Sequence, residues 1–143
     1  MPIRIAVMGE SAGGYLAAMV GASNGDKEFD KGDNLDQSSD VQAVIDLYGL
    51  SDLGKVAADF PKEEQKKHES PAALQALFVN GTSFSAKGGG SVADHPENVQ
   101  AANPVNYISD KTPPFLLMHG DHDRTVSPSQ TELLYNALQE KGI

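Results

Sequence analysis

The sequence predicts an α/β fold in which a parallel sheet is flanked by helices. Two observations support this prediction: three short, mostly apolar segments are spread along the chain, and helical patterns follow the first and the third of them. Such an alternation is typical of parallel α/β sheets. The chain has 143 residues, about the size of one domain, and no repeat or boundary divides it. We therefore expect a single domain over residues 1–143.

The first half of the chain begins with a strand and a helix. Residues 3–8 are mostly apolar, which suits a strand buried on both faces of a sheet. Residues 12–22 carry apolar side chains at helical spacing and are predicted to form a helix. Residues 23–40 are rich in Gly, Asn, Asp and Ser without apolar periodicity, so a surface loop is expected there.

The remaining elements place an insert between the second and third strands. The second strand is predicted over residues 41–48 and the third over residues 113–119. A last helix is expected over residues 127–141, with Gly142 as its terminator. Residues 50–112 form the insert.

Two helical segments are expected inside this insert. The pattern over residues 53–68 is helical in part and is broken at Pro61. A second helix is predicted to start with Ser70 as its cap and Pro71 at its first position.

Composition limits the classes of partner. Twenty acidic residues against 11 basic ones give a net charge of −9, which disfavours nucleic acid and anionic membrane surfaces. No apolar run is long enough to cross a bilayer, so we expect a soluble protein, either cytoplasmic or secreted. There is no cysteine. The aspartates of residues 23–40 lack the calcium-loop spacing, so we expect no metal and no cofactor.

The segment "RIAVMGESAGGYLAAM" has one serine at the junction of the first strand and helix. Ser11 lies between Gly9 and Gly13 in a G-x-S-x-G pattern, which is typical of a nucleophile held on a tight turn. The two glycines are expected to allow the strand and helix to pack closely. The N–H of Ala12 is a candidate donor to an oxyanion. The alternative is a serine that only caps the helix.

A second cluster of chemically active residues follows the third strand, in "FLLMHGDHDRTVSPSQ". Asp121, His122 and Asp123 lie at the carboxyl end of that strand, the edge where sites assemble in open α/β sheets. A carboxylate there could orient a catalytic histidine. Asp123 and Asp121 are the candidates, and the alternative roles are helix capping or loop hydration.

Together with "NLDQSSDVQAVIDLYG" and "ANPVNYI", these segments resemble esterases of the α/β-hydrolase fold. The similar branch contains feruloyl and acetylxylan esterases and hormone-sensitive-lipase-like carboxylesterases. The resemblance implies Ser11 as nucleophile, Ala12 as one oxyanion-hole amide and Asp123, ahead of Asp121, as the triad acid. It also implies a parallel sheet with helices on both faces.

Two parts of that family's catalytic machinery are not found in the sequence. The family's triad histidine follows one further strand beyond the last helix. Its "HGG" oxyanion loop precedes the strand that leads into the tight turn around the nucleophile, here Gly9 to Gly13, which is called the nucleophile elbow. We therefore expect a partial α/β-hydrolase domain, truncated at both ends, with the triad histidine outside this chain. None of the four histidines is expected to replace it: His68, His95, His119 and His122.

The sequence thus predicts a serine carboxylic-ester hydrolase that acts through an acyl-enzyme. The resemblance implies a small-molecule or polysaccharide-linked ester, with an acetyl or feruloyl group. One alternative is a prolyl-oligopeptidase-like serine peptidase. Another is a catalytically incomplete fragment that acts only as an oligomerising scaffold. A homo-oligomer formed through an exposed sheet edge is expected.

Overall fold

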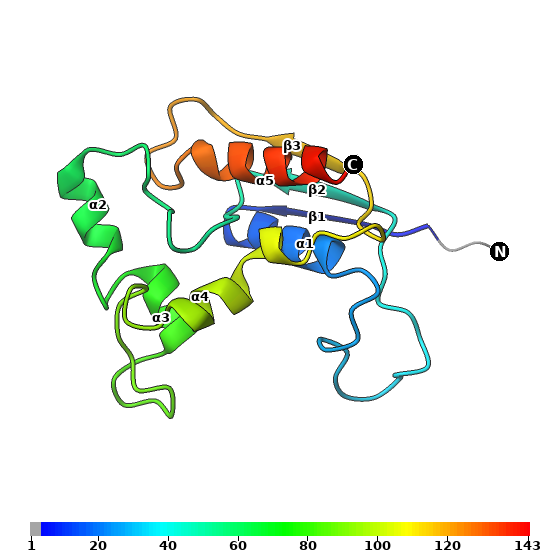
Figure 1. The fold of residues 1–143 in the computed structure, drawn as a ribbon, viewed down its shortest axis with the longest axis horizontal. Helices are drawn as coiled ribbons and strands as arrows, with labels where there is room; N and C mark the ends of the chain where they lie inside the picture. The colour runs from blue at the N-terminus through cyan, green and yellow to red at the C-terminus, as the bar shows by residue number, and fades with distance from the viewer. Residues whose placement is uncertain (1–3) are drawn as a thin grey trace.

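The computed structural model describes residues 4–143 and contains one three-stranded parallel sheet in the order β1-β2-β3 (Figure 1). The elements are, in chain order, β1 (Ala6–Glu10), α1 (Ala12–Ala22), β2 (Ala43–Leu47), α2 (Lys62–His68), α3 (Leu74–Asn80), α4 (Pro96–Ala102), the 3₁₀ turn η1 (Pro104–Asn106), β3 (Phe115–Met118) and α5 (Ser129–Glu140). None of the helices within residues 4–143 has the length and apolar character that crossing a membrane requires.

The predicted α/β order is confirmed, and the strands are shorter than or displaced from their predicted ranges. Helix α1 has the predicted bounds, and α5 begins and ends within the predicted 127–141. Strand β1 continues to Glu10 because Gly9 and Glu10 pair with Asp46 and Leu47 of β2. The apolar pattern ended at Met8, so it could not show these last two pairs. Ile3, at the start of the predicted strand, lies outside the described residues.

The two long helices α1 and α5 pack on the same face of the sheet, so the expectation of helices on both faces is wrong for the described residues. One buried cluster joins the two helices. It contains Ala18 and Ala22 of α1, Leu134 and Leu138 of α5, and Ile108. Side chains of the opposite face are exposed, among them Met8, Leu116 and Met118. Exposed apolar faces and edges favour association, and the homo-oligomer stays a prediction.

The insert contains three short helices, which lie beyond the carboxyl ends of the strands (Figure 1). The predicted cap at Ser70 is wrong: a turn closes from the Ala73 N–H to the Ser70 carbonyl, and α3 begins only at Leu74. Of the predicted 53–68 segment, only the part after Pro61 is helical. Helix α4 was not predicted, although Pro96 at its first turn is a recognised start signal.

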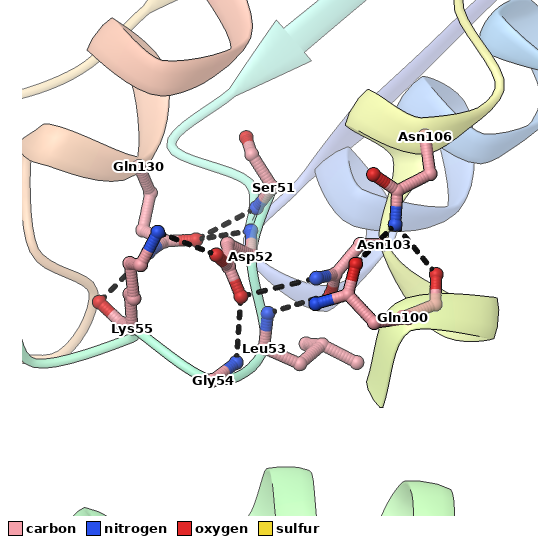
Figure 2. A network of polar contacts seen from close by, with 9 residues as sticks. All are labelled: Ser51, Asp52, Leu53, Gly54, Lys55, Gln100, Asn103, Asn106 and Gln130. Carbon is pink, nitrogen blue, oxygen red and sulfur yellow. Dashed lines mark hydrogen bonds and ion pairs between the residues drawn. The ribbon is translucent and has the colours of Figure 1, made fainter. Parts of the chain in front are cut away.

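Two buried amide side chains hold the start of the insert in place (Figure 2). The Gln130 side chain accepts hydrogen bonds from the Ser51 and Asp52 N–H groups, both at 2.8 Å, and donates to the Lys55 carbonyl. Asn103 accepts from the Leu53 N–H and donates to the Asp52 carboxylate. Because the oxygen and the nitrogen of both side-chain amides are hydrogen-bonded, residues 51–55 are fixed against both α5 and the segment before η1.

Candidate active site

Ser11 occupies a strained turn between β1 and α1. Its backbone has φ 53° and ψ −120°, a region that residues other than glycine rarely adopt. The turn is held on both sides, because the Ser11 N–H donates to the Leu47 carbonyl at 2.9 Å and its carbonyl accepts from the Tyr15 N–H. The surrounding hydrogen bonds therefore keep the serine in a conformation that an isolated chain would avoid.

The glycines around Ser11 are not equally crowded. A Cβ on Gly9 would overlap the backbone carbonyl of Gly13, so only glycine fits at this position. A Cβ on Gly13 would meet no atom within 4 Å, which differs from the expectation that both glycines are needed for close packing. The second crowded position is Gly14, whose Cβ would overlap Oδ1 of Asp46 and lie 3.0 Å from the Leu47 carbonyl oxygen.

The polar groups of the turn are available to a ligand. The Ser11 side chain makes no capping hydrogen bond to α1, so the alternative role as a helix cap finds no support. Ala12 is exposed and begins the helix, where N–H groups lack intrahelical acceptors. No acidic side chain occupies the first turn of α1. The arrangement can present a hydroxyl and an N–H to one carbonyl carbon and its oxygen.

The strain at Ser11 leads to a test by substitution. Ser11→Gly is expected to be about 1 kcal/mol more stable than Ser11→Ala, because only glycine adopts this turn without a Cβ clash. Both variants lack the hydroxyl, so its loss cancels in the comparison. Urea unfolding followed by circular dichroism measures the difference. A Ser11→Gly variant less stable than Ser11→Ala would contradict the strain.

The two candidate acids have different surroundings. The Asp121 carboxylate is 91% exposed and pairs only with the equally exposed His122. The Asp123 carboxylate is 20% exposed, accepts hydrogen bonds from the Thr125 and Val126 N–H groups, and lies 3.3 Å from His119 Nε2.

These contacts also affect the charge of Asp123. Burial raises the pKa of Asp123, but the two N–H donors and His119 outweigh it, so the pKa falls below its ordinary value. Asp123 is therefore a fixed, ionised carboxylate, as a triad acid has to be.

Ser11 lies at the same end of the sheet as the loop that follows β3 and carries Asp123, Thr125 and Val126, here called the Asp123 loop. Ser11 follows β1 and Asp123 follows β3, with β2 between them, which separates the strand ends by about 10 Å. The structure shows no direct contact between Ser11 and Asp123. Ser11 and Ala12 do share a cavity of about 380 Å³ with Thr125 and Val126, the two residues whose N–H groups bind Asp123.

The four histidines differ in how much of the ring is already engaged. His119 is buried, with Nδ1 2.6 Å from the Thr131 hydroxyl and Nε2 3.1 Å from the Val126 carbonyl. His122 and His95 lie beside acids on the surface. His68 is half-buried, lines the Ser11 cavity and has Nδ1 3.3 Å from the side-chain amide of Gln75.

Sequence reasoning missed the insert residues that wall the cavity and one buried acid. Leu74 and Phe78 of α3 reach the cavity, but no local pattern shows which face of a short insert helix does so. Asp46 of β2 is 1% exposed and lies against the first turn of α1. An acid inside an apolar strand, as in "VIDLY", was the available signal. Residues 4–143 contain no group of three side chains placed to hold a metal ion.

Most of the chain is similar in sequence to known proteins. The BD-FAE family model matches residues 2–138. Esterase LipQ of Mycobacterium tuberculosis is 28% identical over 99% of this chain, and Esterase LipC of the same organism is 29% identical over 94%. The chain spans about 30% of the length of each of these curated relatives.

Two solved structures resemble the fold. One is a truncated form of a carbohydrate esterase from gut microbiota, with a TM-score of 0.74 and 25% identity over 99% of this chain and 49% of that one. The other is a bifunctional GH43-CE protein of Bacteroides eggerthii, with a TM-score of 0.71 and 27% identity over 94% of this chain and 17% of that one. The chain therefore belongs to the BD-FAE family and has an α/β-hydrolase fold.

Proposed function

We propose that this chain carries the nucleophile and the acid of a serine carboxylic-ester hydrolase. The observation that carries the proposal is the strained Ser11 at the carboxyl end of β1, opening into a cavity that the Asp123 loop also lines. Relatives that are themselves esterases support the reaction class.

In the proposed reaction the Ser11 hydroxyl attacks the carbonyl carbon of an ester. Its proton goes to a base, a C–O bond breaks, and the alcohol leaves with a proton while the acyl group stays on Ser11. The Ala12 N–H, at the positive end of α1, stabilises the oxyanion of the tetrahedral intermediate. Water then attacks the acyl-enzyme, and the acid is released.

We propose that the base is a histidine from outside this chain, positioned by Asp123. The roughly 10 Å between the ends of β1 and β3 leaves room for one imidazole between the hydroxyl and the carboxylate. The ring of His119 is already hydrogen-bonded through both nitrogens, which supports its exclusion. Asp123 would hold the incoming ring in one tautomer and stabilise it when charged.

The proposed substrate class is an acyl ester, either small or linked to a polysaccharide. The solved relative that is named a carbohydrate esterase supports this class. The candidate bonds are the esters of a sugar hydroxyl with an acetyl group or with a feruloyl group, and the size of the cavity beside Ser11 distinguishes between them. An acylaminoacyl peptidase of known structure shares the fold at 21% identity, which supports the fold alone.

The test uses 4-nitrophenyl acetate, with imidazole added as a diffusible base. The chain is expected to become acetylated on Ser11, as seen by intact-protein mass spectrometry and peptide mapping, and Ser11→Ala is not. Nitrophenol release above the Ser11→Ala background measures the rate. Asp123→Asn is expected to lower that rate at least tenfold, because an acid that orients the base is lost.

Asp121→Asn is the matched control, since this neighbouring carboxylate is exposed and contacts only His122. It is expected to leave the rate unchanged. Equal nitrophenol release by the chain and by Ser11→Ala would overturn the proposed nucleophile. Equal effects of the two aspartate substitutions would overturn the role of Asp123.

A further inference from the structure

The cavity beside Ser11 has mainly apolar walls that come from distant parts of the chain. Helix α1 contributes Tyr15 and Leu16, the start of the insert contributes Leu50 and Leu53, and α3 contributes Leu74 and Phe78. The wall at residues 50–56 is held by the Gln130 and Asn103 amides (Figure 2). The cavity is therefore a built feature of the fold.

The size of the cavity exceeds what an acetyl group needs. About 380 Å³ falls within the range of pockets that bind small molecules. A methyl group would leave most of this space unfilled. An unfilled apolar cavity forgoes the contacts that a longer chain would make with its walls.

Helix α3 presents apolar side chains to the cavity although they are largely open to solvent. Phe78 is 57% exposed and meets the ring of Tyr15 edge-to-face, with centroids 5.6 Å apart. Tyr15 is itself fixed, because its hydroxyl donates to the Ala102 carbonyl at 2.8 Å. Leu16 and Leu74 are also exposed and line the same cavity. Exposed apolar side chains that gather around one site are typical of ligand-binding surfaces.

We propose that this cavity binds the acyl part of the substrate, that this part is an apolar chain longer than acetyl, and that Phe78 sets its length. The inference rests on the proposed function, because the hydroxyl at the cavity rim identifies which bond is attacked. Phe78, which α3 of the insert contributes, acts here as a specificity-determining residue and takes no part in the chemistry.

The acyl group fits this cavity better than the alcohol for two reasons. The acyl group stays bonded to Ser11 after the first step, so it can occupy a recess, whereas the alcohol has to leave. A sugar alcohol would also bring hydroxyl groups against walls of leucine, valine and phenylalanine, where they would lose hydrogen bonds to water.

The experiment measures binding without turnover. The ¹⁵N-labelled Ser11→Ala chain is titrated with straight-chain primary amides from acetamide to octanamide, and amide chemical shifts are followed by NMR. The Kd is expected to fall about fourfold for each added methylene that enters the cavity. The chemical-shift changes are expected to centre on Tyr15, Leu53 and Phe78. The gain in affinity is expected to stop at the amide whose alkyl chain reaches Phe78.

The length limit is tested with a pair of phenylalanines. Phe78→Ala is expected to move the limit to longer amides and to tighten octanamide binding at least fourfold. Phe84→Ala is the control, because Phe84 is 98% exposed and does not line the cavity. Phe84→Ala is expected to leave the whole series unchanged.

A Kd that does not depend on chain length would overturn the proposal, as would shifts centred away from the cavity. Equal effects of Phe78→Ala and Phe84→Ala would remove the role of Phe78. Methyl xyloside is titrated in parallel, and if it binds in the cavity more tightly than hexanamide, the acyl assignment is wrong. Amide binding needs neither the Ser11 hydroxyl nor a base, so absent acetylation with a graded amide series overturns the proposed hydrolysis alone.

Discussion

Gly9→Ala is expected to lower the free energy of unfolding by at least about 3 kcal/mol, a large part of the stability of a domain of this size. The added Cβ would overlap the Gly13 carbonyl, which belongs to the first turn of α1. The overlap is with backbone, so no side-chain rotation relieves it. Relief requires α1 to move away from β1, which would disturb the conformation of Ser11. Urea unfolding followed by circular dichroism measures the loss.

Gly13→Ala is the matched control for this prediction. Its Cβ meets no atom within 4 Å, and alanine is the better helix former by up to about 1 kcal/mol. We expect this variant to be at least as stable as the parent chain. If the two substitutions cost the same, the close approach of β1 and α1 at Gly9 is not what holds the elbow.

The elbow and its position in the fold could be predicted because both depend on short-range features. A strand, a small-residue turn and a helix occupy adjacent positions in the sequence, so Ser11 and α1 followed from local pattern. Parallel pairing then places the end of every strand at one edge of the sheet, which brings the Asp123 loop to the same end as Ser11.

The remaining features depend on long-range packing, which the local pattern does not contain. Gly14 is crowded by the Asp46 side chain and the Leu47 carbonyl, more than 30 positions later in the chain, and no local pattern around Gly14 indicates this contact. The side of the sheet that α5 covers is decided by its shared cluster with α1. The cavity walls follow from how Gln130 and Asn103 hold the insert, and these contacts join residues 50 or more positions apart.

Asp46 is a buried acid directly below the elbow. Its Oδ1 accepts a hydrogen bond from the Gly49 N–H at 2.8 Å, and Oδ2 has no partner among the described residues. The carboxylate also lies against Gly14 in the first turn of α1. Burial raises its pKa from 3.8 to about 6, although the Gly49 N–H and His119 both act to lower it.

Because the pKa of Asp46 is higher in the folded chain than in the unfolded chain, the folded state binds this proton more tightly. The stability that Asp46 contributes is therefore fully present below about pH 4 and is lost as the pH rises to about 6. A rise of about two units in the pKa of Asp46 corresponds to a free energy of unfolding of about 3 kcal/mol. Asp46→Asn cannot ionise and can still accept the Gly49 N–H, so it is expected to avoid this loss.

The measurement is the free energy of unfolding of the chain and of Asp46→Asn between pH 4.5 and 7.5. The difference between them is expected to move in favour of Asp46→Asn by about 2 kcal/mol across this range. Acids with lowered pKa values, Asp59 and Asp123 among them, act in the opposite direction at lower pH, and they contribute equally to both proteins. Asp121→Asn, which changes an exposed carboxylate, is expected to track the parent chain. Parallel curves for the parent chain and Asp46→Asn would show that Asp46 is already ionised in the folded protein at pH 4.5, and that water reaches it beneath the elbow.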